Sequence, residues 1–219
     1  MRVEERDLKD FAEMRLSDFL EELGSSSPAP GGGSVAAIAG ALGASLAKMV
    51  ANLTVGKEKY SDNEETMIAV RDDAKKLAVE FMEQATEDTM AFNTFMEALS
   101  MPKDSNNEKT ARREGMQKAL KRSTEAPLRI LELSRELAVL CLTAAEMGNP
   151  NAISDAGVSA LMASSAARGA AFNAQVNLAS IDDPYYREMS AAVIERELGS
   201  VEKIVKETLS RVRSSLNLS

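Results

Sequence analysis

The chain has no histidine, no tryptophan and only one cysteine, Cys141, among its 219 residues. Without histidine, neither a Ser–His nor a Cys–His nucleophile pair can form. One cysteine and no histidine also cannot supply the ligands of the zinc sites in hydrolytic deaminases. We therefore expect no metal centre, and any catalysis must use Asp, Glu, Lys, Arg, Tyr, Ser or backbone groups.

Three further features of the sequence limit the kind of protein that it can encode. Cys141 lies in an apolar helical run and is expected to be a buried, inert thiol, which fits a reducing compartment. The formal charge is −8, and Lys and Arg alternate with acidic or polar residues, so we expect no nucleic-acid partner. The first seven residues are mostly charged and lack an apolar signal core, which predicts a cytoplasmic protein.

Only residues 35–53 are apolar enough to be tested as a membrane span. Their apolarity comes largely from alanine and glycine, and they include Lys48. Spanning a bilayer requires about 20 strongly apolar residues. We therefore expect no membrane partner and place this segment in a protein core.

Helical periodicity dominates the chain, and no convincing run alternates apolar and polar residues as a half-buried strand would. The predicted helices cover residues 7–23, 34–53, 62–100, 107–147, 155–179 and 184–216. Pro127 lies inside the fourth helix, where it predicts a kink or the first turn of a new helix. We expect one all-α domain, residues 1–219: a bundle of long helices with two central Ala/Gly-rich helices.

Two polar loops each precede a helix of small residues. The first is Ser27-Pro28-Ala29-Pro30-Gly31-Gly32-Gly33-Ser34, and the second is Gly148-Asn149-Pro150-Asn151-Ala152-Ile153-Ser154-Asp155-Ala156-Gly157. Backbone N–H groups at such a helix start can hold an anion, although the glycines can equally serve only a tight turn against another helix. Ser34 and Ser154 are the expected N-caps of the two helices.

Asp88 is a carboxylate in an unexpected place. On a helical wheel it lies about 20° from Phe81 on the apolar stripe, whereas Glu87 lies about 120° away on the polar side. A carboxylate on a buried face costs several kcal/mol unless it is paired or protonated. The position is typical of a functional carboxylate with a raised pKa, and equally of a structural ion pair or a stripe that opens to solvent.

Four other polar residues carry weaker signals. Asp155 follows Ser154 at a helix start, where ordinary capping chemistry explains it, and Lys103 is explained as a solvated loop lysine. Asn173 and Asn177 lie one turn apart in a mostly apolar helix. Their amides either line a cavity or form hydrogen bonds across a helix interface.

Taken together, the motifs resemble the formiminotransferase-cyclodeaminase C-terminal domain family, which includes stand-alone methenyltetrahydrofolate cyclohydrolases. The first loop with Val35-Ala36-Ala37 resembles its opening signature, and Glu87-Asp88 through Phe92 with Met101-Pro102-Lys103 resembles its middle motif. The second loop, continued by residues 169–178, resembles its third motif. The resemblance covers about residues 10–210, and no formiminotransferase domain is recognised, so we do not expect a channelled bifunctional role.

The resemblance implies an all-α homodimer that acts on a tetrahydrofolate derivative as substrate, without a cofactor. A cyclodeaminase closes a formimino group at N5 onto N10 and releases ammonia, whereas a cyclohydrolase adds water to the methenyl carbon and yields 10-formyltetrahydrofolate. The sequence does not separate the two, and a non-catalytic helical oligomeric scaffold is the alternative.

The resemblance also assigns roles to residues. Asp88 is the expected proton-transfer or cation-stabilising carboxylate, with Asp155 and Lys103 as secondary candidates. The residues expected to hold the pterin or the glutamate tail are Pro30, Gly31, Gly32, Gly33, Ser34, Asn151 and Ser154.

Overall fold

The computed structural model describes residues 11–217, and in this range it is built from α-helices and short 3₁₀ segments, with no strand. The helices are α1 (Leu16–Leu23), α2 (Gly32–Asn52), α3 (Glu64–Ser100), α4 (Asn106–Met147), α5 (Ile153–Leu178) and α6 (Pro184–Ser215). Two 3₁₀ segments, Glu58–Asn63 and Pro150–Ala152, precede α3 and α5. The all-α prediction is confirmed.

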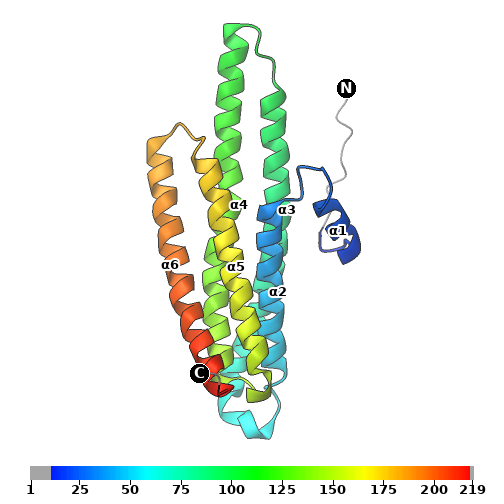
Figure 1. Cartoon of the computed structure of the whole chain (residues 1–219), viewed down its shortest axis with the longest axis vertical. Coiled ribbons are helices and arrows are strands. Elements are labelled where there is room, and N and C mark those ends of the chain that lie inside the picture. The colour runs from blue at the N-terminus through cyan, green and yellow to red at the C-terminus, as the bar shows by residue number, and fades with distance from the viewer. Residues whose placement is uncertain (1–10, 218–219) are drawn as a thin grey trace.

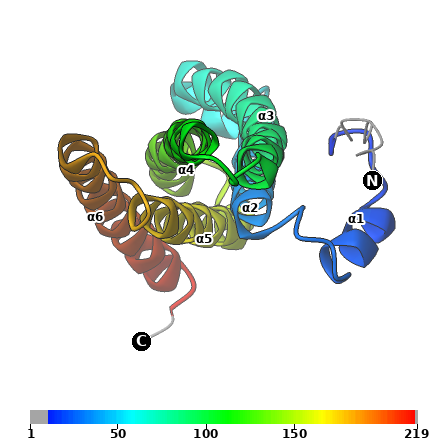
Figure 2. The same cartoon turned by 90° about the horizontal axis from the view of Figure 1, so that it is seen from above.

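The five long helices lie nearly parallel to one axis and α1 stands apart beside α2 and α3 (Figure 1). Seen from above, α2 and α5 lie side by side beneath α3 and α4, with α6 at the edge next to α5 (Figure 2). Helices α3 and α4 form a hairpin that extends past the N-terminus of α2 (Figure 1). The α3–α4 hairpin therefore continues beyond the first turn of α2.

Small residues set how closely α2 approaches its neighbours. A Cβ at Gly40 would overlap the ring of Phe81 on α3, and one at Gly169 on α5 would lie 2.9 Å from the Cβ of Ala36. Each glycine costs helix propensity of about 1 kcal/mol relative to alanine. The close approach offsets that cost because it lets Phe81 pack fully buried against α2.

Pro127 does not break α4, which runs continuously from residue 106 to 147. Proline lacks an N–H, so the carbonyl of Ser123 loses its normal partner within the helix. The side-chain Nδ2 of Asn177 on α5 donates to that carbonyl at 2.7 Å. Asn177 is therefore an amide that forms a hydrogen bond across a helix interface, as one of the two sequence interpretations held.

Three predicted helix starts differ from those observed. The helix predicted over residues 7–23 begins at Leu16, because residues 11–14 turn back and place Phe11 against the ring of Phe19; residues 7–10 lie outside the described range. Ser34 is not an N-cap: Gly31 occupies that position. Ser154 is not an N-cap either, because Ala152 precedes α5 and Asn149 caps the 3₁₀ segment before it.

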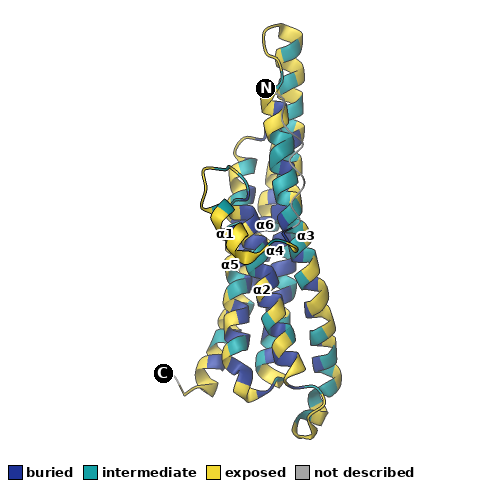
Figure 3. Cartoon of the chain, turned by 90° about the vertical axis from the view of Figure 1, so that its right-hand side faces the viewer, coloured by how far each residue is buried: buried dark blue, intermediate teal, exposed yellow. Residues whose placement is uncertain are grey.

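Helix α2 is long and apolar enough to cross a membrane by length and composition alone, and 56% of its most apolar stretch is buried inside the fold. This buried share fits a core helix. Yet α2 and α5 each leave a stripe of apolar side chains exposed, in keeping with the mixed burial along the bundle (Figure 3). The large apolar members of the two stripes are Val35, Leu42, Met49, Val158, Leu161, Phe172 and Val176.

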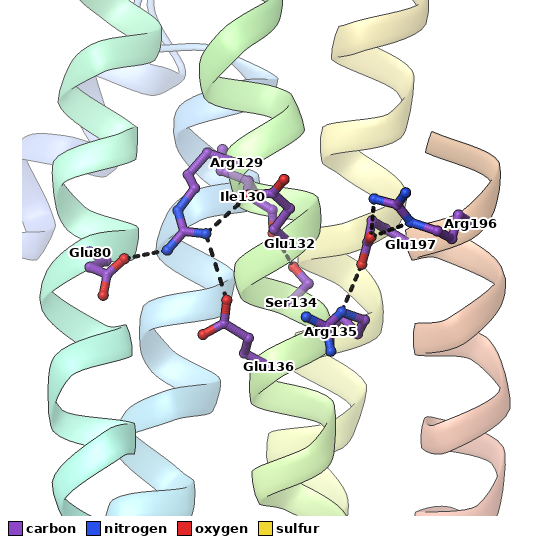
Figure 4. Close-up of polar contacts among 9 residues, drawn as sticks. All are labelled: Glu80, Arg129, Ile130, Glu132, Ser134, Arg135, Glu136, Arg196 and Glu197. Carbon is purple, nitrogen blue, oxygen red and sulfur yellow. Dashed lines mark hydrogen bonds and ion pairs between the residues drawn. The ribbon is translucent and has the colours of Figure 1, made fainter. Parts of the chain in front are cut away.

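Ion pairs connect the outer helices across the bundle. Arg129 on α4 donates to Glu80 on α3 at 2.7 Å (Figure 4). Glu197 on α6 is only 4% exposed and is held by Arg135 of α4 and by its neighbour Arg196, both at 2.8 Å. A buried carboxylate needs such partners, because losing one leaves a charge uncompensated. Arg135 and Arg196 thus compensate the buried charge of Glu197.

The close packing of α2 predicts a difference between two glycine substitutions. Gly40→Ala should lower the free energy of unfolding by about 1–3 kcal/mol or more, because its Cβ overlaps the buried Phe81 ring. Gly199→Ala on α6, where a Cβ meets nothing within 4 Å, should raise that free energy by about 1 kcal/mol. Urea unfolding followed by circular dichroism measures both. Equal effects would contradict the account of α2 packing.

Candidate functional site

The Asp88 carboxylate from α3 lies against the first turn of α2. The Ser34 hydroxyl donates to its Oδ2 at 3.2 Å. The Ser34 backbone N–H faces the same carboxylate and favours its charged form. The same hydroxyl contacts the Ala85 carbonyl at 3.4 Å and the Thr89 hydroxyl at 3.3 Å. Gly31 at the N-cap has no side chain, so Asp88 supplies from another helix the acceptor that a capping residue normally provides.

Gly33 makes this contact possible. A Cβ built on Gly33 would overlap the carboxylate of Asp88. Because the obstruction involves the whole carboxyl group, a larger residue at this position would displace the Asp88 carboxylate from Ser34 or move α2 away from α3. The run of glycines therefore serves close approach at this point, and it exposes backbone N–H groups to the carboxylate.

Burial raises the pKa of Asp88 above its ordinary value, and the hydrogen bonds from Ser34 only partly counteract that effect. The residue is partly buried, and between residues 11 and 217 no Lys or Arg forms an ion pair with it. The nearest charged neighbour in sequence, Glu87, pairs instead with Arg122 at 3.9 Å. Asp88 is thus a carboxylate without a cation, and the structural ion pair considered from sequence does not explain it.

Asn173 lies on the other side of the same turn. Its Nδ2 donates to the Gly169 carbonyl of its own helix at 2.8 Å and would lie 3.4 Å from a Cβ on Gly32. The amide is partly buried, and unlike Asn177 it forms no hydrogen bond to another helix within the described chain. The first turn of α2 therefore has a carboxylate on its α3 side and an amide on its α5 side.

The structure brings together one part of the predicted site. Ser34 and Asp88 are in contact, and Gly33 packs against the carboxylate. Gly31 precedes this turn as its N-cap, and Pro30 is buried just before it.

The second loop lies at the opposite end of α2. Asn149 donates from its Nδ2 to the Leu53 carbonyl, just past the last residue of α2. Because α2 has 21 residues, the loop lies about 30 Å from Ser34 along the bundle, at 1.5 Å per residue. Within one chain, Asn151, Ser154 and Asp155 therefore do not share a site with Asp88.

Lys103 is also remote from Asp88. It is exposed in the loop after α3, beyond Ser100. The helix rises about 18 Å between Asp88 and Ser100. The side chain therefore lies at the tip of the α3–α4 hairpin rather than beside the carboxylate.

Two residues near Asp88 were not predicted as site residues. Thr89 had no signal, because a threonine inside a long helix looks like an ordinary partly exposed position. Asn173 stands out in the sequence as a polar residue on an apolar helix face, but so does Asn177. Only the packing of α5 on α2 shows that Asn173 lies beside the first turn of α2, whereas Asn177 donates to α4.

Cys141 does not take part in this site. It is fully buried and shares a hydrogen bond with the Ser159 hydroxyl at 3.0 Å. Burial raises the pKa of the Cys141 thiol to about 12, so the thiol stays protonated and is a poor nucleophile. The prediction of an inert buried cysteine is confirmed.

The arrangement around Asp88 can move a proton or stabilise a cation. A carboxylate whose pKa is raised toward neutrality accepts and returns protons more effectively than an ordinary Asp. Its negative charge, in surroundings of low polarity, also attracts a positive centre strongly. Among the described residues no cluster of His, Cys, Asp and Glu could hold a metal ion.

Comparisons with known proteins identify the family of the chain. Residues 15–196 match the family model described as formiminotransferase-cyclodeaminase. A methenyltetrahydrofolate cyclohydrolase from Methylorubrum extorquens is 39% identical over 92% of this chain and 97% of its own length. A formimidoyltransferase-cyclodeaminase from Mus musculus is 32% identical over 79% of this chain, which matches only 32% of that protein.

A solved structure shows the same fold. The formiminotetrahydrofolate cyclodeaminase of Thermotoga maritima superposes with a TM-score of 0.83 at 27% identity, covering 94% of this chain and 97% of that one. Together with the family match over residues 15–196, this shows that the chain belongs to the formiminotransferase-cyclodeaminase family.

Proposed function

We propose that the chain is a folate one-carbon enzyme acting at the N5/N10 bridge of tetrahydrofolate, as a methenyltetrahydrofolate cyclohydrolase or a formimidoyltetrahydrofolate cyclodeaminase. The observation that carries the proposal is the unpaired carboxylate of Asp88, with its raised pKa, against the first turn of α2. The names of the relatives support it, and none of those reported is a scaffold. A purely structural helical scaffold would not require a carboxylate in this place.

Both reactions pass through a tetrahedral carbon between N5 and N10. In the cyclohydrolase reaction, Asp88 accepts a proton as water bonds to the methenyl carbon, and returns it to N5 as the carbon–N5 bond breaks. The hydroxyl proton leaves to solvent, and the formyl group stays on N10. In the cyclodeaminase reaction, a proton passes from N10 to the departing nitrogen, which takes a second proton and leaves as ammonia. The same carboxylate stabilises the cationic methenyl carbon in both.

Other residues take supporting roles in the proposal. Pro30, Gly31, Gly32, Gly33 and Ser34 shape the turn that holds the pterin or the tail of the substrate. The reaction needs no metal or cofactor beyond the folate substrate itself. A cytoplasmic location is part of the proposal, and the single cysteine, Cys141, is free and buried.

A homodimer would complete the site. The apolar stripes on α2 and α5 are uncovered in one chain, and these are the helices whose sequences predict a central position. A second copy packed antiparallel on this face would place its Asn151, Ser154 and Asp155 at the end of the bundle that holds Asp88. Asp155 would then be close enough to orient substrate or transfer a proton, while Lys103 could do so only at the tip of the hairpin.

The two activities are separated by supplying each substrate in turn. The purified chain is incubated with 5-formimino- or with 5,10-methenyltetrahydrofolate while the methenyl absorbance is followed. A cyclodeaminase should produce absorbance and ammonia from the first, and a cyclohydrolase should remove absorbance from the second. Absence of turnover with both substrates would refute the proposed function.

Substituting Asp88 should separate catalysis from folding. Asp88→Asn should lower kcat by about 10²–10⁴-fold, as expected for loss of a proton-transfer group. Its stability should equal or exceed that of the wild type at neutral pH, because Asn keeps an acceptor for Ser34 and removes a buried charge. That gain should shrink as the pH falls through the raised pKa of Asp88, since the wild-type carboxyl is then neutral too.

Glu87→Gln is the matched control, since Glu87 is the exposed neighbour of Asp88 on the same helix. It should retain turnover within about twofold, which is under 1 kcal/mol in barrier. The acid limb of the wild-type kcat profile should lie above the pKa of about 3.9 of an ordinary Asp. Turnover of Asp88→Asn within about threefold of wild type would exclude the assigned role.

The homodimer is tested by light scattering coupled to gel filtration. Wild type should elute as a dimer, and Phe172→Glu, which places a charge in the α5 stripe, should elute as a monomer. Tyr185→Glu is the control, because Tyr185 on α6 is 72% exposed, much like Phe172 at 69%, but lies outside the two stripes. A monomeric wild type at the enzyme concentration used for assay would contradict the dimer.

A further inference from the structure

The tip of the α3–α4 hairpin is positively charged, whereas the chain as a whole is negatively charged. Residues 103–122 contain seven Lys or Arg and three Asp or Glu, although the whole chain carries a formal charge of −8. Four of these cations line one open pocket of about 310 Å³. The residues lining this basic pocket are Lys103, Lys109, Arg112, Arg113, Met116, Gln117 and Asp182.

The framework of the basic pocket is fixed by hydrogen bonds. Arg112 donates from Nε to the Leu99 carbonyl at 3.0 Å, and Arg113 pairs with Asp182 at 2.7 Å. Gln117 donates to the Ser180 carbonyl and accepts from the Asp182 backbone N–H, so the loop after α5 is tied to α4. Within residues 11–217, Lys103 and Lys109 form no ion pair. The pocket thus combines two anchored guanidinium groups with two uncommitted ammonium groups.

The basic pocket and Asp88 both lie along the α3–α4 hairpin. Asn173, beside the first turn of α2, is near the C-terminal end of α5, and Asp182 follows in the loop after α5. On α3, about 17 Å of helix rise separates Asp88 from Leu99, to whose carbonyl Arg112 donates. The α3–α4 hairpin forms one continuous wall between the two places (Figure 1).

We infer that the basic pocket binds the carboxylates of the substrate's glutamate tail while the one-carbon bridge lies at Asp88. This inference rests on the proposed function, because that function supplies a substrate with the pterin and its one-carbon bridge at one end and carboxylates at the other. Arg and Lys hold carboxylates through charge-assisted hydrogen bonds. The rigid aminobenzoyl group keeps the two ends of such a substrate apart, as the pocket and Asp88 are kept apart. Lys103 then binds the tail and takes no part in proton transfer.

The test compares two charge reversals on α4 with two substrates. Lys109→Glu places an acid in the pocket, in the first turn of α4 where the helix dipole favours one, so folding should be retained. Lys118→Glu makes the same change in net charge at an exposed position that does not line the pocket. Each variant is assayed with the glutamate-bearing folate and with the matching pteroate derivative, which lacks the glutamate.

Lys109→Glu should raise KM for the glutamate-bearing substrate by about tenfold, with a smaller effect on kcat, because it opposes a charge-assisted contact. It should leave KM for the pteroate derivative within twofold of wild type, and Lys118→Glu should change neither KM. The wild-type KM should also rise more steeply with ionic strength for the glutamate-bearing substrate than for the pteroate derivative, which keeps only its benzoate carboxylate. Equal effects of Lys109→Glu on both substrates, or equal effects of the two variants, would overturn the inference.

A binding measurement separates this inference from the proposed reaction. In an NMR titration, p-aminobenzoylglutamate should shift the resonances of residues 103–117 in wild type and in Lys118→Glu, but not in Lys109→Glu. This arm needs no turnover. If wild type converts neither substrate yet binds the probe here, the reaction is wrong and the carboxylate pocket stands. If wild type converts the folates and the probe shifts none of these resonances, the pocket is wrong and the reaction stands.

Discussion

The contact between the Asp88 carboxylate and the first turn of α2 links the fold of this chain to its chemistry. For the carboxylate to reach the Ser34 N–H and hydroxyl, Gly33 must have no side chain and α2 must lie close to α3. The same burial raises the pKa of Asp88. The carboxylate that contacts the first turn of α2 from a neighbouring helix thereby also holds its proton more tightly than an ordinary Asp, as a proton-transfer group requires.

Elsewhere in the bundle, helices also pack closely, and backbone carbonyls at these contacts accept hydrogen bonds from side chains. Gly40 admits the Phe81 ring, and Gly43 brings its carbonyl within 2.7 Å of the Ser159 hydroxyl. Asn177 donates to the carbonyl that Pro127 leaves without a partner. Each case places a polar or small group where two helices meet, so the long helices can pack closely without burying unsatisfied backbone. Among buried side chains in the described range, no N or O atom lacks a hydrogen-bond partner.

Much of the fold could be predicted from the sequence, because long helices carry their own signals. The apolar periodicity located the five long helices within a few residues, and the helical wheel placed Asp88 on a buried face. The wheel gives the face of a residue but not which partner it meets. Ser34 was therefore taken for a cap of its own helix, when it lies inside the helix and contacts a carboxylate on another.

The arrangement of the site could not be predicted in the same way. The two polar loops have similar composition, which suggested one pocket, but α2 and α5 run antiparallel and separate them by the length of α2. Such a separation depends on helix direction and register, which a single sequence does not reveal. Likewise, the Lys and Arg residues near residue 110 look like a solvated helix face until the loop after α5 closes against them.

We expect the one-carbon bridge of a folate to lie at the first turn of α2, beside Asp88. The most direct measurement is a crystal structure of the chain with a bound, non-reacting analogue of the methenyl folate. The account predicts N5, N10 or the bridging carbon at hydrogen-bonding distance, about 3 Å directly or through one water, from the Asp88 carboxylate. An analogue bound with its bridge at another place, and with Asp88 contacting only Ser34, would contradict it.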